Sequence, residues 1–239
     1  MRNFHVKELP EIGGTVDLPE AEARHALRVL RLAVGDRIAL FNGLGEVASA
    51  EIVEARIGRR ACGLRVRVFD RSRAQPVRPQ VHLYVAPPKG RRMDFLVQAT
   101  AALGVASVHP IKCRYAVAEP ASRACLEQWS RQAVEALKQS GYRFLPQFHA
   151  PVAFAEALAG SPPGFFGDLG LSAQARGLTA AQIPEECALW IGPEGGFCQG
   201  ERDELRAGGL RGLTVGKSIL RVELAAAVAL GVLIGAKVE

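Results

Sequence analysis

The stretch IGPEGGF (residues 191–197) follows the apolar run CALW (residues 187–190), so a buried strand leads directly into a loop with one proline and three glycines. Glycine permits positive φ angles and close approach of a ligand to the backbone, while proline stiffens a loop. In parallel α/β sheets, ligands bind outside the carboxyl ends of the strands, where such loops lie. The stretch therefore indicates a ligand-binding loop, although a tight strand-to-helix turn would have the same composition.

The region around this loop alternates strands with helices. VHLYVA (residues 81–86) and SVHPI (residues 107–111) read as buried strands, with MDFLVQATAALG (residues 93–104) as a helix between them. This alternation is typical of α/β domains with a mainly parallel sheet, which we predict over residues 73–239. Its further predicted elements are a helix around residues 126–137, strands at GFFGDL, CALWIG and LTVG (residues 164–169, 187–192 and 213–216), a helix at ERDELRAGG (residues 201–209) and a last helix from about Ser218.

The first part of the chain has a different pattern. GDRIALFNG, VASAEIVEARI and CGLRVRVF (residues 35–43, 47–57 and 62–69) alternate apolar and polar residues, which predicts a small antiparallel barrel or sheet. LPEAEARHALRVLRL (residues 18–32) predicts a short amphipathic helix. RSRAQPVRP (residues 71–79) cannot continue a strand ladder and is read as a linker. We therefore expect a separate small β domain over residues 1–72.

Composition narrows the class of protein. Of the 239 residues 49% are hydrophobic, enough for a sizeable core, and the net charge of +6 suits an anionic partner without requiring one. The 5 cysteines form no CxxC pair, and we read them as reduced thiols in the core. We expect no secretory leader, because the first residues show no basic segment followed by an apolar one. The longest apolar run is shorter than the roughly 20 residues that cross a membrane. We expect a soluble, cytoplasmic protein, and the histidines show no metal-ligand spacing.

A second stretch, VGKSILRVELAAAVAL (residues 215–230), has two charges, Arg221 and Glu223, at the start of an otherwise apolar helix. A helix that is apolar all round is buried in a core or an interface, so these charges need a reason. Two interpretations stay open: a buried ion pair that only shapes the fold, or a functional role. Neither the dinucleotide fingerprint GxGxxG nor the P-loop is present, so neither kind of phosphate-binding loop is supported.

IGPEGGF and VGKSILRVELAA together resemble the two C-terminal signatures of the 16S ribosomal RNA (uracil-N3) methyltransferases, a family of the SPOUT class. RNF and RHALRVLRLAVGDRIALFNG resemble that family's PUA-like RNA-binding domain, and YVAPPKGRRMDFLVQATAALGV extends the resemblance through the middle of the chain. The resemblance implies a SPOUT domain with a deep trefoil knot, S-adenosylmethionine (SAM) as cofactor, a homodimer, and methyl transfer to N3 of a uridine in small-subunit ribosomal RNA.

The resemblance also implies a SAM pocket with three walls: the glycine-rich loop, the residues after FFGDL, and VGKSIL (residues 215–220). Backbone amides and carbonyls there would hold the edge of the adenine, and apolar side chains would cover its faces. The expected cofactor-binding residues are Gly170, Leu171, Ile191, Gly192, Pro193, Glu194, Gly195, Gly196, Val215, Gly216, Ile219 and Leu220.

Arg221 and Glu223 are the catalytic candidates. N3 of uracil must lose a proton, and the resulting negative charge spreads to O2 and O4. We expect Arg221 to stabilise this charge and Glu223, or a water that it orients, to take the proton. Phosphate contacts to RNA are expected from Arg2, Arg24, Arg28, Arg31, Lys89, Arg91, Arg92 and Arg114.

Four positions depart from the family's pattern. Acidic residues would be expected where this chain has Ala102, Cys113 and Lys138, and a threonine where it has Leu224. These departures concern the handling of the substrate more than the SAM loops. A second function therefore stays open: a catalytically weak or inactive relative that binds structured RNA or assists ribosome assembly.

Overall fold

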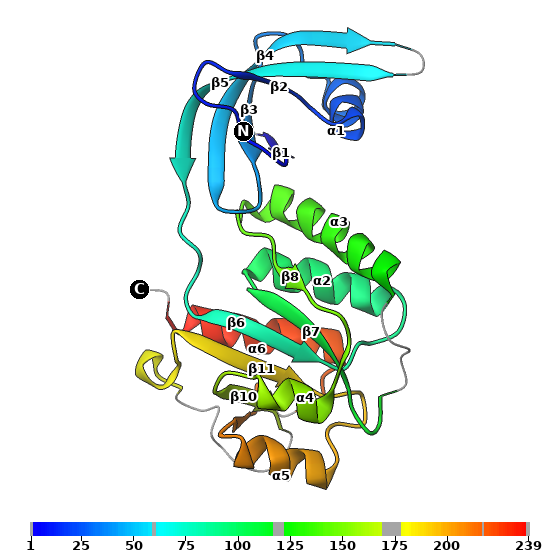
Figure 1. Cartoon of the computed structure of the whole chain (residues 1–239), viewed down its shortest axis with the longest axis vertical. Coiled ribbons are helices and arrows are strands. Elements are labelled where there is room, and N and C mark those ends of the chain that lie inside the picture. Colours follow the sequence, from blue (N-terminus) through cyan, green and yellow to red (C-terminus); the bar gives the residue numbers. More distant parts are fainter. Residues whose placement is uncertain (1, 59–60, 117–121, 169–177, 217, 238–239) are drawn as a thin grey trace. The chain divides into compact units, whose positions relative to one another are not determined.

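The computed structural model describes residues 2–58, 61–116, 122–168, 178–216 and 218–237. The chain divides into two compact units. The first comprises Met1–Pro76 together with Leu137–Phe144, and the second comprises Val77–Ala136 and Leu145–Glu239 (Figure 1).

The first unit is built on a five-stranded sheet with the order β1-β3-β4-β5-β2. The pairs among β3, β4, β5 and β2 are antiparallel, as the alternating sequence predicted, whereas β1 runs parallel to β3. Alternate residues of β5, Leu64, Val66 and Val68, are buried in the core of this unit. The strands are β1 (Arg2–His5), β2 (Thr15–Asp17), β3 (Arg37–Phe41), β4 (Glu46–Ile57) and β5 (Cys62–Arg73).

A short helix covers the apolar side of this sheet. α1 (Glu20–Arg24) begins after Pro19, and a π-helical turn over His25–Val29 continues it. Proline suits the start of a helix, and the two acidic residues in the first turn complement the helix dipole. Ala23, Ala26 and Leu27 of this segment are buried in the same core as the strands, which confirms the predicted amphipathic helix.

The segment Leu137–Phe144 belongs to the first unit through polar contacts that the sequence pattern did not predict. Lys138 Nζ lies 2.9 Å from Glu22 Oε1, and the backbone carbonyl of Lys138 accepts a 2.8 Å hydrogen bond from the Asn3 amide. The Arg143 guanidinium donates to Asn3 Oδ1 at 2.8 Å and lies over the ring of Phe41. Hydrogen bonds, an ion pair and a cation–π contact therefore join this segment to residues more than a hundred positions earlier in the chain.

The second unit contains a seven-stranded sheet in which β12-β10-β11-β6-β7-β8 follow one another and β9 pairs with β7. All of these pairs are parallel, so the predicted α/β class is confirmed. The strands are β6 (Gln80–Val85), β7 (Ser107–Lys112), β8 (Gln147–Phe148), β9 (Val152–Ala153), β10 (Gly164–Gly167), β11 (Glu186–Ile191) and β12 (Arg211–Leu213).

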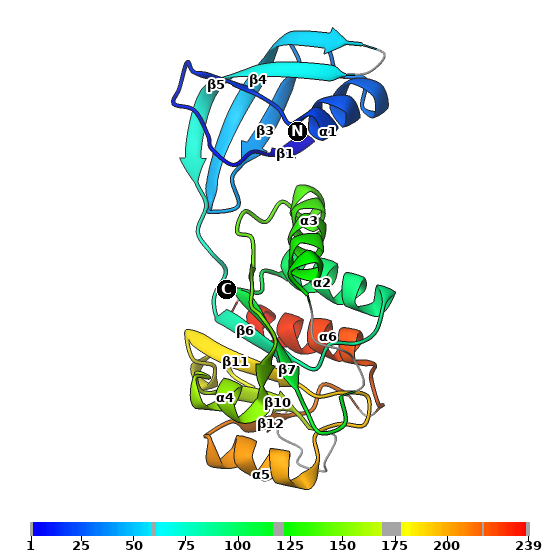
Figure 2. The ribbon, with the colours of Figure 1, turned by 45° about the vertical axis from the view of Figure 1, so that its right-hand side comes forward.

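Helices cover both faces of this sheet (Figure 2). α2 (Arg91–Leu103) and α6 (Val222–Gly235) pack against each other, and α6 contacts β6 and β11. On the other face, Tyr84 and Trp190 share a core with residues of α4 (Phe154–Ala159) and α5 (Gln199–Ala207). α3 (Arg123–Ser140) follows β7. No helix in the described part of the chain is long and apolar enough to cross a membrane.

Three predicted boundaries were wrong. The stretch RSRAQPVRP was read as a linker from residue 71, but β5 continues through Arg73 and pairs with β4 there. The other two errors concern the segment between β12 and α6. β12 is Arg211–Leu213, so the predicted strand LTVG is mostly loop. α6 begins at Val222 instead of Ser218, and Arg221 precedes it with extended backbone angles, φ −65° and ψ 153°. Several residues of this segment line a pocket. Their tertiary contacts therefore override the local preference for strand or helix.

The cysteines differ in their surroundings. Cys62, Cys113 and Cys187 are buried, as predicted, whereas Cys125 and Cys198 are partly exposed. Burial raises the pKa of Cys113 to about 12 and that of Cys187 to about 11, while hydrogen bonds with Ser122 lower the pKa of Cys125. The thiolate is the reactive form. At pH 8 we therefore expect iodoacetamide to modify Cys125 in the native protein and Cys113 and Cys187 only after unfolding, as measured by peptide mass spectrometry.

Candidate functional site

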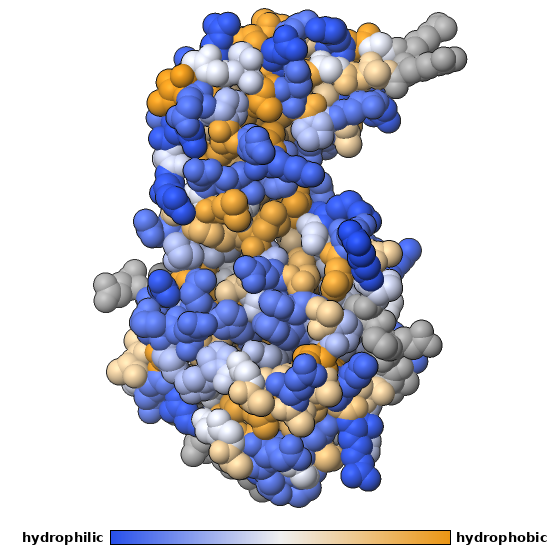
Figure 3. Space-filling view, viewed as in Figure 1, coloured by the Kyte–Doolittle hydropathy of each residue, from blue (hydrophilic) through white to orange (hydrophobic). Residues whose placement is uncertain are grey.

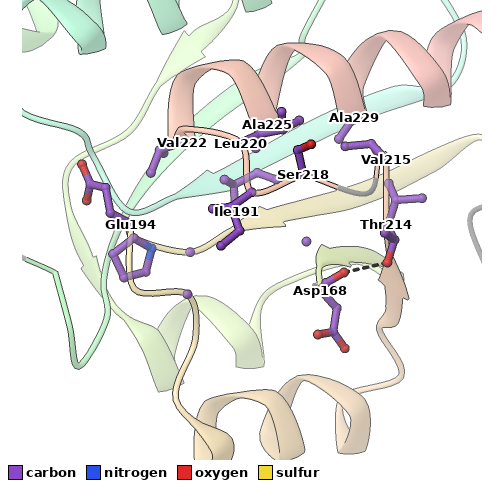
Figure 4. A pocket seen from close by; sticks show the side chains of 17 residues that line it. Asp168, Ile191, Glu194, Thr214, Val215, Ser218, Leu220, Val222, Ala225 and Ala229 are labelled. Carbon is purple, nitrogen blue, oxygen red and sulfur yellow. Dashed lines mark hydrogen bonds between the residues drawn. The ribbon is translucent and has the colours of Figure 1, made fainter. Parts of the chain in front are cut away.

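A pocket opens at the carboxyl ends of β10, β11 and β12, where a parallel α/β sheet places its ligands (Figure 4). Its walls are the end of β10, the glycine-rich loop after β11, the loop after β12 and one side of α6. The pocket has a volume of about 90 Å³ and opens to solvent on one side. Its lining is largely apolar side chain and glycine backbone, a surface suited to a flat, partly apolar ligand.

Most of the predicted cofactor-binding residues lie together in this pocket. Gly195 is the exception among the described residues, because it does not line the pocket and is exposed. Gly170 and Leu171 lie outside the described residues. The predicted residues that do line the pocket are Ile191, Gly192, Pro193, Glu194, Gly196, Val215, Gly216, Ile219 and Leu220.

Other pocket residues were missed by the sequence analysis. Because the strand was predicted at LTVG, Leu213 and Thr214 were not considered as part of a loop. On α6, three residues at helical spacing line the pocket. They were not predicted, because a helix that is apolar all round does not show in its sequence which side faces a ligand. The missed residues are Gly167, Asp168, Leu213, Thr214, Val222, Ala225 and Ala229, whereas Ser218 lies within the predicted wall 215–220.

The glycine-rich loop is a tight turn with little room for side chains. The amide of Gly196 donates to the carbonyl of Pro193 at 2.8 Å, and Gly196 has a φ of 73°, a left-handed conformation that favours glycine. A Cβ atom on Gly192 would lie 3.1 Å from the amide nitrogen of Phe197. The loop therefore presents fixed backbone groups to the pocket, because Phe197 anchors its end in the core.

Asp168 joins two walls of the pocket to each other and to α5. Its backbone carbonyl accepts a 2.7 Å hydrogen bond from the hydroxyl of Thr214, drawn in Figure 4. Its carboxylate is buried and lies 2.9 Å from the Arg206 guanidinium of α5, and that guanidinium also stacks over the ring of Phe166. The pair therefore ties the end of β10 to α5 and, through Thr214, to the loop after β12.

Replacing Arg206 with methionine is expected to lower the free energy of unfolding by about 1–3 kcal/mol. Removal of one partner from a buried pair costs about 3–5 kcal/mol, and we reduce this because the Arg206 side chain is 49% exposed. Urea denaturation measures the effect. Arg202→Met, on the same helix, is the control, and an equal loss in both variants would contradict a specific role of the Asp168 pair.

Arg221 and Glu223 are not an ion pair in the described structure. Arg221 is exposed, immediately before α6, and has no charged partner among the described residues. Glu223 is buried, and its Oε2 atom has no hydrogen-bond partner. It lies on the helix stripe of Ala226 and Leu230, next to the stripe that lines the pocket. The interpretation as an ion pair that only shapes the fold is therefore wrong.

The predicted RNA-binding cations lie on both units. Arg24 forms an ion pair with Glu20, and the Arg28 guanidinium donates to the carbonyl of Gly58 at 2.8 Å. In the second unit Arg92, at the start of α2, lies 2.6 Å from Glu194 of the pocket. Each candidate except Arg92 is exposed; the exposed ones are Arg2, Arg24, Arg28, Arg31, Lys89, Arg91 and Arg114.

The four unusual positions have distinct surroundings. Cys113 is buried in the core that contains Trp190, so apolar packing occupies the site where a carboxylate was expected. Lys138 pairs with Glu22 in the first unit. Ala102 lies half-buried on α2, and Leu224 is 42% exposed on α6.

Comparison with known proteins agrees with this architecture. The model of the RNA methyltransferase domain family matches residues 75–234, and the model of the RNA methyltransferase PUA domain matches residues 18–60. The chain belongs to the RNA methyltransferase family. The resemblance inferred from the two C-terminal motifs is thereby confirmed, as is the PUA-like nature of the first part of the chain.

Named relatives match over nearly the whole chain. "Ribosomal RNA small subunit methyltransferase E" of Synechocystis sp. is 30% identical, over 92% of this chain and 72% of the relative. The protein of the same name from Mycobacterium tuberculosis is 28% identical, over 95% and 89%.

Solved structures agree as well. The Neisseria gonorrhoeae ribosomal RNA small subunit methyltransferase E, bound to SAM, matches with a TM-score of 0.82 and 26% identity, over 97% of this chain and 95% of that one. A Legionella pneumophila protein, also in complex with SAM, matches with a TM-score of 0.84 and 27% identity, over 98% and 97%.

Proposed function

We propose that this protein is a cytoplasmic SAM-dependent methyltransferase that modifies N3 of a uridine in 16S ribosomal RNA. The observation that carries the proposal is the pocket between the glycine-rich loop, the loop after β12 and α6, in a family whose relatives are named for methylation of small-subunit ribosomal RNA. Two structures of similar fold have SAM bound. The specificity for N3 of uridine rests on the resemblance of the two C-terminal motifs.

The residues of the pocket suit SAM. Backbone groups of Gly192, Gly196 and Gly216 would meet the polar edge of the adenine, and Ile191 and Leu220 would cover its faces. Bound SAM supplies the methyl group from its sulfonium. The protein holds the uracil in line with that methyl group, and such positioning is worth up to roughly 7–11 kcal/mol in the best intramolecular cases.

The exposed Arg221 stabilises the charge that develops on the uracil oxygens. It stands beside Val222 and Leu220 of the pocket, and no carboxylate in the described structure neutralises it. Glu223 does not line the pocket. We therefore propose that its carboxylate accepts the proton of N3 through an intervening water. Asp168 and Glu194, the two carboxylates in the lining, are each engaged by an arginine and are poorer candidates for the base.

Methyl transfer to RNA is the test of this function. Small ribosomal subunits without the modification are incubated with the protein and SAM labelled in the methyl group, and mass spectrometry of nuclease fragments identifies the modified atom. N3-methyluridine at one site is the expected product. RNA binding without transfer would overturn the proposal in favour of the RNA-binding relative, and methylation of another atom would overturn its specificity.

We also propose that the protein carries the trefoil knot and functions as a homodimer. Exposed apolar side chains gather on the two helices that cover one face of the sheet: Phe95 and Leu103 on α2, and Leu224 and Val232 on α6. An interface between two copies would remove these side chains from water, and small residues such as Gly231 allow helices to approach closely.

Leu224→Glu is expected to convert the dimer into a monomer, because a buried unpaired carboxylate in the interface costs several kcal/mol. Light scattering after gel filtration measures the mass. Ile12→Glu replaces a more exposed apolar residue of the first unit and is expected to leave the dimer intact. A Leu224→Glu protein with the mass of the wild-type dimer would show that α6 is not in the interface.

A further inference from the structure

Four aromatic rings form a continuous parallel stack across the α4 face of the sheet. Trp190 of β11 stacks on Tyr84 of β6 with centroids 4.6 Å apart, Tyr84 on His109 of β7 at 4.4 Å, and His109 on His149, just after β8, at 4.0 Å. Their planes deviate by only 6°, 13° and 8°. Strand register creates this row, since Trp190 pairs with Tyr84 and Tyr84 with His109. The stack runs from the buried Trp190 to the exposed His149.

Polar groups border the stack on the side of the strands' amino ends. Ser107 Oγ lies 2.6 Å from His82 Nδ1 and 2.7 Å from His109 Nε2, so a single hydroxyl joins the two rings. His82 Nε2 is 3.0 Å from Glu186 Oε1, but the geometry is unsuitable for a hydrogen bond, and Nε2 is buried without a partner. Burial lowers the pKa of His109 to about 4 and also lowers that of His149, so both rings are uncharged at neutral pH.

Except for the buried Trp190, these residues line two adjoining hollows, which we call the histidine groove. The hollows measure about 400 and 480 Å³ and share Tyr84, His109, His149 and Gly160. Their only charged lining residues in the described structure are Glu186 and Glu156, and neither hollow is lined by lysine or arginine. Hydrophilic side chains gather over β6 and β11 on this face of the sheet (Figure 3).

The histidine groove is separate from the SAM pocket. Gln80, His82, Ser107 and Glu186 stand at the amino ends of their strands, whereas the SAM pocket lies at the carboxyl ends. Among the described residues, the two linings have no residue in common. A ligand in the groove is therefore a different molecule from the cofactor.

We propose that the histidine groove binds the guanidinium group of an arginine presented by a basic protein partner. A guanidinium is planar and stacks on the uncharged imidazole of His149, the exposed end of the row. Glu186 lines the same hollow as His149 and Glu156 lines the adjoining one, so two carboxylates attract the cation into the groove of a protein whose net charge is +6. The phosphates of RNA need cationic partners. The described lining of the groove offers them two carboxylates and no lysine or arginine, so RNA is not the expected ligand.

The arginine side chain itself is the first probe. Acetyl-arginine-amide is titrated into the full-length protein while NMR follows the histidine ring signals, with acetyl-lysine-amide and uridine as comparators. We expect saturable binding of the arginine compound with a Kd of about 1–10 mM, as befits one exposed ion pair and one stacked ring. We expect the lysine compound to bind at least about threefold more weakly, since a compact ammonium cannot stack.

Matched variants connect this binding to the groove. Glu186→Gln should weaken binding at least about fivefold, whereas Glu204→Gln, an exposed carboxylate on α5, should not change it. His149→Ala should weaken binding and His149→Phe should restore it, because phenylalanine keeps a flat ring. Uridine binding in place of arginine, an equal loss in Glu204→Gln, or no saturable binding would each overturn the proposal.

This inference does not rest on the proposed methyltransferase function, and SAM titrations of the same variants separate the two. Glu186→Gln and His149→Ala should bind SAM as the wild type does, because neither residue lines the SAM pocket. Failure of the arginine probe alongside normal SAM binding would count only against the groove. Failure of SAM binding in the wild-type protein would count only against the enzyme.

Discussion

Gly192→Val abolishes SAM binding, whereas Gly195→Val leaves the Kd within about threefold of the wild-type value: this is the expected result of calorimetric titration. A Cβ on Gly192 would lie 3.1 Å from the amide nitrogen of Phe197 and 3.2 Å from the carbonyl carbon of Gly196, so the loop that lines the pocket must shift. A loss of at least about 100-fold, nearly 3 kcal/mol, is expected from this displaced backbone and the added side chain.

Gly195 provides the matched control because it belongs to the same motif. The nearest atom to its added Cβ is the Cβ of Tyr115 at 3.8 Å, an ordinary contact, and Gly195 does not line the pocket. Ala225→Leu fills the pocket from α6 without touching the loop and is expected to weaken SAM binding as well. Thermal unfolding of each variant shows that it is folded. Equal SAM affinity in Gly192→Val and Gly195→Val would show that SAM does not bind in this pocket.

The contrast between these two glycines shows what the sequence could predict about the site. The strand CALW followed by IGPEGGF predicted the right loop at the right edge of the sheet, because that inference needs only the topology. It did not distinguish Gly195, which turns outward, from Gly192 and Gly196. Which glycine faces the ligand depends on a turn closed by the Gly196 amide and on the anchoring of Phe197, and neither is a periodic feature of the sequence.

A similar limit applies to the fold. Long periodic segments such as β4 and α2 were predicted close to their observed bounds, because each has many residues on one buried face. β8, β9 and α4 were not predicted, since elements of two to six residues carry too little pattern. Residues 214–216 and 218–221 were read as strand and helix because their apolar side chains resemble a core segment, while in the structure several of them line the pocket.

Arg221→Ala is expected to lower kcat about 10²–10³-fold while the Kd for SAM changes less than about threefold. Removal of a single group that stabilises developing negative charge costs this much in other enzymes. The exposed guanidinium has no charged partner in the described structure and does not line the pocket, so its loss should leave SAM binding intact. Single-turnover methyl transfer measures the rate. Arg221→Lys should recover part of it, since an ammonium retains the charge without the planar fork.

Glu223→Gln separates charge stabilisation from proton removal. Glutamine keeps the shape of the buried side chain but cannot accept the proton of N3, so kcat should fall about 10²-fold at neutral pH. Raising the pH ionises N3 of the uracil in solution and makes a base unnecessary. The rate of Glu223→Gln should therefore approach that of the wild type at high pH, whereas Arg221→Ala should stay slow because the anion still lacks its counter-charge. If Glu223→Gln is fully active at neutral pH, the proton leaves directly to solvent and the carboxylate serves the helix terminus instead. If Arg221→Ala recovers with pH as Glu223→Gln does, the arginine acts on the proton transfer and not on the charge of the uracil.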